Sequence, residues 1–403
     1  MFCLAHDDIR VPAGAGLGER VRTARVKRGM SREVVAGLCG RSEEWLRQIE
    51  RGRRGTSLRM VTRLAEVLRV SDLTELLGEE VPTAVYARPA HDALARVQRA
   101  LATWSPESNG TPSDLADLRR RVASAWLLRS MSSTDRSDLA AVLPDLLVDG
   151  QRSARSTQRQ EAYQLLAEVY HLSQLYLCYQ PAPELLWVVV DRGMSAAQAS
   201  GDAATLARAA WFAAYLYRDS GALDLAHQVV DDAFGYLAVA GDRSPAVERQ
   251  RCVVHLASAW NHARDGHPAQ AWREWDAAVD ADAGAQPDSA HALFGARCDD
   301  MALTLDVELG RAASALRRAA ATDVNAIVSV PRRTRVMIEA ARGHLLKNEH
   351  TGAVHLLQRA HRTSPEATLY SMHARSMVHG MSTSAPPMLR AEVDQLASAL
   401  RIG

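Results

Sequence analysis

The sequence predicts an all-α chain in two parts, a compact N-terminal unit of five short helices and a long array of paired helices behind it. Three observations predict this. Apolar residues recur at helical spacing along most of the chain. Glycines and serines divide the first 80 residues into pieces the length of short helices. No segment beyond residue 114 shows the alternation typical of a strand. At 403 residues, the chain has room for two or more domains.

The helices of the N-terminal unit are marked by their own end signals. Glycines placed to end the first three helices are Gly29, Gly40, Gly52 and Gly55. Serines placed to cap the second to fifth helices are Ser31, Ser42, Ser57 and Ser71. Helices this short are unstable alone, so the unit has to fold around one shared core. The residues expected in that core are Leu17, Val21, Val35, Leu38, Leu46, Ile49, Val61, Leu64 and Leu68.

Positive charge is concentrated in this unit. Residues 16–70 carry 14 Arg and Lys against 6 Asp and Glu, a net charge of +8, whereas the remainder carries 34 against 41, a net charge of −7. Neutralising phosphates and releasing their counterions supplies most non-specific affinity for nucleic acid. A compact basic unit on a mildly acidic body is therefore typical of a nucleic-acid binder.

The third helix is the one expected to read DNA. Ala36 lets two helices cross closely, Gly40 permits the turn, and Leu46 and Ile49 pack the third helix onto the second. The outer face of the third helix then consists of Ser42, Glu43, Glu44, Arg47, Gln48 and Arg51. A helix in the major groove reads bases mainly from its N-terminal half, where arginine suits guanine and glutamate suits cytosine. The residues suited to phosphate contacts, which position without specifying, are Arg32, Arg41, Arg51, Arg53 and Arg54.

Many of these residues recur in a known pattern over residues 17–78. They are Gly18, Glu19, Arg20, Arg25, Gly29, Met30, Ser31, Ala36, Gly40, Ser42, Gln48, Ile49, Glu50, Arg51, Gly52, Leu64, Ala65 and Leu68. The segment resembles a helix-turn-helix of the xenobiotic-response-element and lambda-repressor type. Arg32 departs from the Gln usual in that family, and Gly55 and Thr56 replace its proline. The resemblance implies a regulator that binds double-stranded DNA as a homodimer; the alternative is a helical bundle that is merely basic.

The rest of the chain divides at polar breaks. Residues 1–15 are expected to form a flexible tail, 16–80 the DNA-binding domain, and 81–113 a linker with a short helix near residues 91–104. From 114 to 403, amphipathic segments alternate with turn signals. Four of these turns, at Gly221, Gly266, Gly310 and Asn348, each precede an alanine by five residues.

Those alanines, Ala226, Ala271, Ala315 and Ala353, are 45, 44 and 38 residues apart, which suits an α-solenoid of paired helices. The last unit resembles a tetratricopeptide repeat, with Ala341, Ala353, Leu357, Ala360 and Pro365 at the characteristic positions. In such arrays the first helix of each pair lines a concave groove. Carried over residue by residue, that face consists of Arg208, Trp211, Phe212, Tyr215, Arg218, Trp260, Arg264, Arg297, Asp300, Arg335, Glu339 and Arg342.

Aromatic residues and arginines are common at binding hot spots, and arginines suit a peptide carboxylate or another anion. The same residue types also fit an ordinary core or a solvated surface. Together the two parts predict a cytoplasmic, sequence-specific DNA-binding regulator whose repeats bind a peptide, small-molecule or protein effector, an arrangement that resembles the peptide-pheromone receptors of Gram-positive bacteria. The alternative is a DNA-tethered interaction scaffold with no small ligand. An open groove would favour the first hypothesis and a self-filled groove the second.

Other classes of protein are not expected. The H-E-x-x-H, P-loop and G-x-S-x-G motifs are absent, so an enzyme is not predicted. No cofactor or metal is predicted, since the five cysteines form no C-x-x-C pair and His255, His262 and His267 fit helix surfaces or packing. No window is apolar enough for a membrane span, and the N-terminus lacks the features of a secretion signal.

Overall fold

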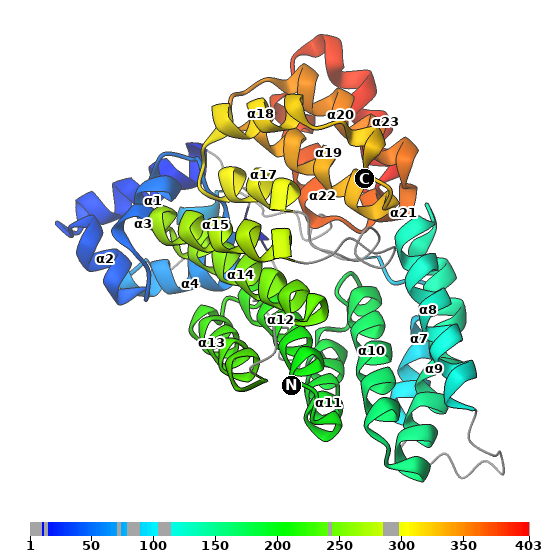
Figure 1. Ribbon diagram of the computed structural model, residues 1–403. Helices are drawn as coiled ribbons and strands as arrows, with labels where there is room; N and C mark the ends of the chain where they lie inside the picture. Colours follow the sequence, from blue (N-terminus) through cyan, green and yellow to red (C-terminus); the bar gives the residue numbers. More distant parts are fainter. Residues whose placement is uncertain are drawn as a thin grey trace.

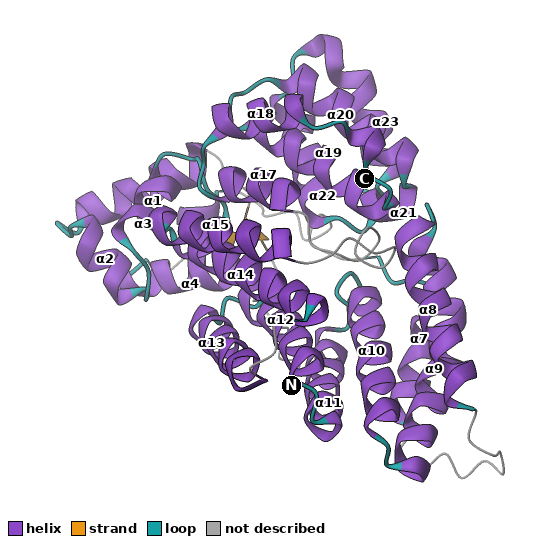
Figure 2. Cartoon of the chain, viewed as in Figure 1, coloured by secondary structure: helices purple, strands orange, loops and turns teal. Residues whose placement is uncertain are grey.

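The computed structural model is almost entirely helical (Figures 1 and 2). It describes residues 10–11, 15–70, 74–78, 89–103, 114–240, 244–284 and 298–402. A small N-terminal unit lies against one side of a long, curved stack of helices. The predicted fold class is therefore confirmed.

The N-terminal unit contains the five predicted helices. They are α1 (Ala15–Lys27), α2 (Arg32–Leu38), α3 (Glu43–Glu50), α4 (Leu58–Val67) and α5 (Thr74–Leu77). Ser31, Ser42 and Ser57 each accept a hydrogen bond from the backbone N–H three residues later, as expected of N-caps. Ser71 lies outside the described residues.

The core of the unit forms as predicted except at one position. The other eight predicted residues are buried, and Trp45 and Cys39 are buried with them. Leu38 is 50% exposed, so its predicted core position is wrong. Helix α2 ends at Leu38, and the chain turns there so that the next residue, Cys39, points inward. Gly18 brings α1 close to α3, since a Cβ atom at this position would overlap the carbonyl oxygens of Ile49 and Glu50.

A two-residue strand pair ties part of the tail to this unit. Strand β1 (Arg10–Val11) pairs antiparallel with β2 (Thr56–Ser57), which directly precedes α4. Residues 10 and 11 of the predicted tail therefore have backbone partners in an extended segment of the unit, and residues 1–9 and 12–14 lie outside the described residues.

Between residues 94 and 402, the described parts of the chain form a succession of helices. They are α7 (Leu94–Ala102), α8 (Leu115–Met131), α9 (Asp135–Thr157), α10 (Gln160–Leu177), α11 (Pro183–Ser200), α12 (Ala203–Asp219), α13 (Leu223–Ala240), α14 (Pro245–Asp265), α15 (Pro268–Gly284), α17 (Cys298–Glu308), α18 (Ala312–Ala321), η2 (Val324–Ala326), α19 (Val330–Leu345), α20 (His350–Thr363), α21 (Pro365–Leu369), α22 (Met372–Ser384), η3 (Pro387–Leu389) and α23 (Arg390–Ala399). Helix α7 lies in the stretch where the short linker helix was predicted. No helix among the described residues is both long and apolar enough to cross a membrane.

The predicted repeat register is present. The turns of α12–α13, α14–α15, α17–α18 and α19–α20 contain Gly221, Gly266, Gly310 and Asn348, all with positive φ. The four alanines that follow them are fully buried where the paired helices meet. The helix pairs are consistent with a solenoid; that they are tetratricopeptide repeats stays a prediction.

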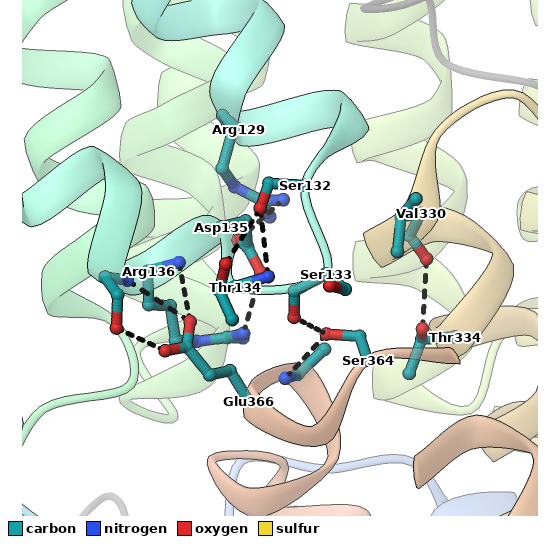
Figure 3. A network of polar contacts seen from close by, with 12 residues as sticks. Arg129, Ser132, Ser133, Thr134, Asp135, Arg136, Val330, Thr334, Ser364 and Glu366 are labelled. Carbon is teal, nitrogen blue, oxygen red and sulfur yellow. Dashed lines mark hydrogen bonds and ion pairs between the residues drawn. The ribbon is translucent and has the colours of Figure 1, made fainter. Parts of the chain in front are cut away.

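The solenoid curves until its C-terminal helices contact its first helices (Figure 1). Helix α19 contacts α8, and α21 contacts α9. At this junction Glu366 Oε2 accepts hydrogen bonds from the backbone N–H groups of Arg136 and Ser137 at 3.0 and 3.2 Å (Figure 3). Ser364 Oγ also donates to the carbonyl of Ser133 at 2.8 Å. Glu366 therefore caps α9 from the far end of the stack, where N–H groups lack intrahelical partners.

Candidate nucleic-acid interface and the inner face of the solenoid

The polar residues of helix α3 differ in how accessible they are. Glu43 and Arg51 are exposed to solvent. Arg47 has a 42% exposed side chain and pairs with Glu44. Gln48 also donates to Glu44. These contacts leave Glu43, Arg47 and Arg51 as the accessible part of the predicted reading face.

Glu50, at the end of α3, is buried between two arginines. Arg25 Nε donates to Glu50 Oε1 at 2.5 Å, and Arg32 Nε donates to Glu50 Oε2 at 2.7 Å. Burial alone would raise the pKa of Glu50, but hydrogen bonds from Arg25 and Arg32 hold that pKa below its usual value. Arg32 thus contributes to the internal structure of the unit, and its predicted phosphate contact stays a prediction for the accessible part of its guanidinium.

Other predicted DNA contacts lie against the solenoid. Ser42 Oγ donates to the carbonyl of Asp265 at 2.9 Å, and Arg41 donates to the carbonyl of Gly221 at 3.2 Å. Arg54 is 6% exposed and donates to the carbonyl of Ala263 at 3.1 Å. The expectation that Ser42 lies on an open outer face is therefore wrong in this arrangement, because the end of α14 covers it.

Two turns of the solenoid, one between α14 and α15 and the other between α17 and α18, pack their backbone directly on the N-terminal unit. A Cβ atom at Gly266 would lie 2.8 Å from Ser42 Oγ and 3.2 Å from Trp45 Cβ. A Cβ atom at Gly310 would lie 2.9 Å from Gln48 Oε1 and 3.2 Å from the Cβ of Arg53. Gln48 is therefore also covered on one side, and its Oε1 is buried without a hydrogen-bond partner among the described residues.

The N-terminal unit is the part of the chain that matches a known family. Residues 16–77 match a family model described as a helix-turn-helix domain. The N-terminal unit is a helix-turn-helix domain. The matched residues span α1 to α5 of this domain. No curated protein and no solved structure matches the chain.

On the inner face of the solenoid, two arginines stack on one tryptophan. Arg218 is 3% exposed, and its guanidinium lies 3.9 Å from the centre of the Trp260 ring. Arg335 lies 4.8 Å from the same ring and donates to Thr304 Oγ1 at 3.1 Å. Tyr215 meets the Trp260 ring edge-on, with the ring centres 6.3 Å apart. Burial lowers the pKa of Arg218 to about 10, so the group stays a cation at neutral pH.

A second group of predicted effector residues forms a chain of ion pairs. Glu308 lies 3.4 Å from Arg264 and 3.3 Å from Arg342, and Arg342 also pairs with Glu339 at 2.6 Å. Burial alone would lower the pKa of Arg342, but the carboxylates of Glu339 and Glu308 raise it. These charges therefore satisfy one another within the chain.

The remaining predicted effector residues are placed differently. Arg208 pairs with Glu168 at 2.9 Å, and Asp300 pairs with Arg332 at 2.6 Å. Trp211 is partly buried and packs on the hydrophobic core. Arg297 lies outside the described residues.

Phe212 is a core residue. It is 4% exposed and stacks on His171 of α10, with the ring centres 4.3 Å apart. Its predicted position on the groove is wrong, because this side of α12 packs on α10.

Arg136 is a buried residue of the solenoid that the sequence patterns did not indicate. It is 3% exposed, and its guanidinium lies 4.2 Å from the Tyr179 ring and 5.4 Å from the Tyr370 ring. Asp135 and Glu366 also lie beside it. Its partners come from both ends of the solenoid, so no local pattern around residue 136 could have indicated them.

The histidines noted in the sequence have ordinary neighbours. His255 pairs with Glu274 at 2.8 Å, and the rings of His262 and His227 lie 4.7 Å apart. Within the described ranges, no group of three or more His, Cys, Asp or Glu side chains is arranged to hold a metal ion.

Proposed function

We propose that this chain is a sequence-specific, DNA-binding transcriptional regulator of the xenobiotic-response-element type, acting as a homodimer. The match of residues 16–77 to a helix-turn-helix domain carries this proposal. The net charge of +8 over residues 16–70 supports it, since such a charge attracts the phosphate backbone. On this proposal, α3 enters the major groove and reads bases with Arg47 and Glu43, and with Glu44 once its contacts to Arg47 and Gln48 are exchanged for a base.

The repeat domain is proposed to modulate DNA binding through an effector that carries an anionic group. Supporting this, Arg218 Nε and Trp260 Nε1 are buried and have no hydrogen-bond partner among the described residues. Unpaired buried donors are costly, so an anionic group that satisfied them would gain affinity. Arg335, stacked on the same tryptophan, adds positive charge beside them.

The second candidate is a DNA-tethered interaction scaffold with no small ligand. One observation favours it: most charges on the inner face are already paired within the chain, as in Arg264–Glu308, Arg342–Glu339 and Arg208–Glu168. When the charged side chains of the inner face pair with one another, fewer of them are available to bind a ligand. Both candidates share the DNA-binding domain and differ only in the partner of the repeats.

A selection experiment tests the proposal. The purified full chain is mixed with a library of random duplexes, and the bound duplexes are sequenced over several rounds at fixed salt. Enrichment of an inverted-repeat motif is expected, since a symmetric dimer binds two half-sites. Binding that stays sequence-blind and falls steeply with salt would contradict a sequence-specific regulator.

A further inference from the structure

Three consecutive turns of the solenoid lie along the helix-turn-helix domain. We call them the turn row: the backbone around Gly221, Gly266 and Gly310, which follows α12, α14 and α17. Each turn approaches the stretch that runs from the start of α3 to the start of α4. A Cβ at Gly221 would come 3.9 Å from Ser57 Oγ, and the other two turns approach Ser42, Trp45, Gln48 and Arg53 still more closely.

The turn row offers this domain hydrogen-bond acceptor oxygens, as a phosphate backbone does. Carbonyl oxygens at the C-terminal end of a helix carry partial negative charge, because the peptide dipoles align. Arg54 donates to such a carbonyl, that of Ala263 in the last turn of α14. Arg41 donates to the carbonyl of Gly221 in the turn after α12 and lies 3.8 Å from the carboxylate of Asp265. Both arginines are among the proposed phosphate contacts. The charge of −7 on the rest of the chain complements the +8 of the basic unit.

Docking on the turn row covers part of the surface that α3 would present to a major groove. A helix with its side chains is about 10–12 Å across, and the major groove is about 12 Å wide. A backbone turn packed on the Ser42 and Gln48 side of α3 therefore occupies space that a DNA duplex around α3 would need. Here the α14–α15 turn covers the N-terminal end of α3 at Ser42 and Trp45, and the α17–α18 turn approaches Gln48.

We propose that the turn row is an intramolecular docking surface that holds the helix-turn-helix domain in a state unable to bind DNA. This inference rests on the proposed function, since it assumes that the freed domain binds DNA. DNA and the turn row compete for Arg41, Ser42 and Arg54, so DNA affinity depends on how often the domain leaves the row. An effector raises or lowers DNA affinity only if it binds the docked and released states differently.

A reversible covalent lock tests the docking directly. The double variant Arg53→Cys with Gly310→Cys places two thiols at positions whose Cβ atoms would be 3.2 Å apart, near the separation of about 3.5–4.5 Å found in disulfides. The native cysteines at 39, 178, 252 and 298 are buried, and Cys252 lies beside Cys298, so any response of the native thiols to oxidation is measured on the single variant Arg53→Cys. Binding to a labelled random-sequence duplex at low salt is followed by fluorescence anisotropy, with and without reductant.

We expect the oxidised double variant to lose DNA binding by at least about tenfold and to regain it when reduced. Arg53→Cys alone is the control, and its binding should not respond to oxidation. Equal binding of the oxidised and reduced double variant would overturn the docking inference. So would a folded double variant in which the disulfide does not form.

A charge reversal on the solenoid side leaves every proposed DNA contact in place. Asp265→Arg puts a cation next to Arg41, at a helix C-terminus where positive charge is tolerated. Asp394→Arg, at an exposed position of α23, is the matched control because it changes the net charge equally. We expect about tenfold tighter binding for Asp265→Arg and little change for the control. Equal gains would count against docking, whereas no binding by any variant or by the reduced protein would mean that the proposed function itself is wrong.

Discussion

Glu366 caps helix α9 by accepting a 3.0 Å hydrogen bond from the backbone N–H of Arg136, 230 residues earlier in the chain. This contact joins α21 to the start of α9 and closes the curve of the solenoid. With Ser364 and Asp135 beside it, the junction brings residues from both ends of the repeat domain into one polar network (Figure 3).

Replacing Glu366 by Ala should destabilise the repeat domain. The change leaves the N–H groups of Arg136 and Ser137 without an acceptor, which should cost about 2–3 kcal/mol. Thermal and urea unfolding measure the effect. Glu184, exposed in the first turn of α11, is the matched control, and Glu184→Ala should change stability by about 0.5 kcal/mol or less. Equal effects of the two variants would show that the capping contact contributes nothing.

Gly18→Ala should disrupt the helix-turn-helix domain. The new methyl group would collide with the backbone oxygens of Ile49 and Glu50 where α1 crosses α3. Overpacking of this kind typically costs about 1–3 kcal/mol, and here the obstacle is rigid backbone. Gly37→Ala is the control: it also lies in a helix, has open space around it, and should be neutral or stabilising. Circular dichroism melts and DNA binding report both changes, and an unaffected Gly18→Ala protein would contradict the close crossing.

Arg47 and Arg53 should affect DNA binding in different ways. Arg47→Ala should cost about 1–3 kcal/mol on the selected motif and relax preference at one base pair, because a bidentate contact to guanine would be lost. Arg53→Ala should weaken selected and random duplexes alike, because it removes a phosphate contact. Titrations of both duplexes at several salt concentrations separate the two patterns. The assignment of α3 as the reading helix would fail if both variants lost affinity uniformly.

Stability should fall in mild acid through His171. Its ring is buried against Phe212 and neither ring nitrogen has a hydrogen-bond partner among the described residues. Burial, with a smaller contribution from the charge of Arg208, lowers the pKa of His171 well below its usual value. The unfolded chain therefore binds a proton on His171 at pH ~6.5, whereas the folded chain does not. The stability that neutral His171 contributes is present above that pH and is lost as the pH falls below it.

His171→Phe should flatten this dependence, because it keeps an aromatic ring on Phe212 and removes the titrating group. Melting temperatures measured from neutral to mildly acidic pH provide the test. The exposed His355 is the control, and His355→Gln should keep the slope of the wild-type protein. A His171→Phe protein with the unchanged slope would assign the acid sensitivity to other groups.

The sequence by itself determined the local structure of this protein. Serine caps, left-handed glycines and apolar spacing act within a few residues, so the five helices of the N-terminal domain and the turns at Gly221, Gly266 and Gly310 could be predicted. The prediction that Leu38 lies in the core was wrong, because a shift of one residue at a helix end changes which side chain points inward. The cation-rich surface of the domain was likewise visible in composition alone.

Only the tertiary structure decided where the charged surfaces meet. Arg41 donates a hydrogen bond to a carbonyl 180 residues away in the sequence, and Ser42 donates to a carbonyl 223 residues away. Those acceptors are backbone groups at helix ends, which any residue type can supply, so no sequence pattern marks them. The pairing of the arginines that were predicted to line a groove, and the surroundings of Arg136, depend in the same way on the curvature of the whole solenoid. That curvature is the sum of many small packing angles between helix pairs, which periodicity does not encode.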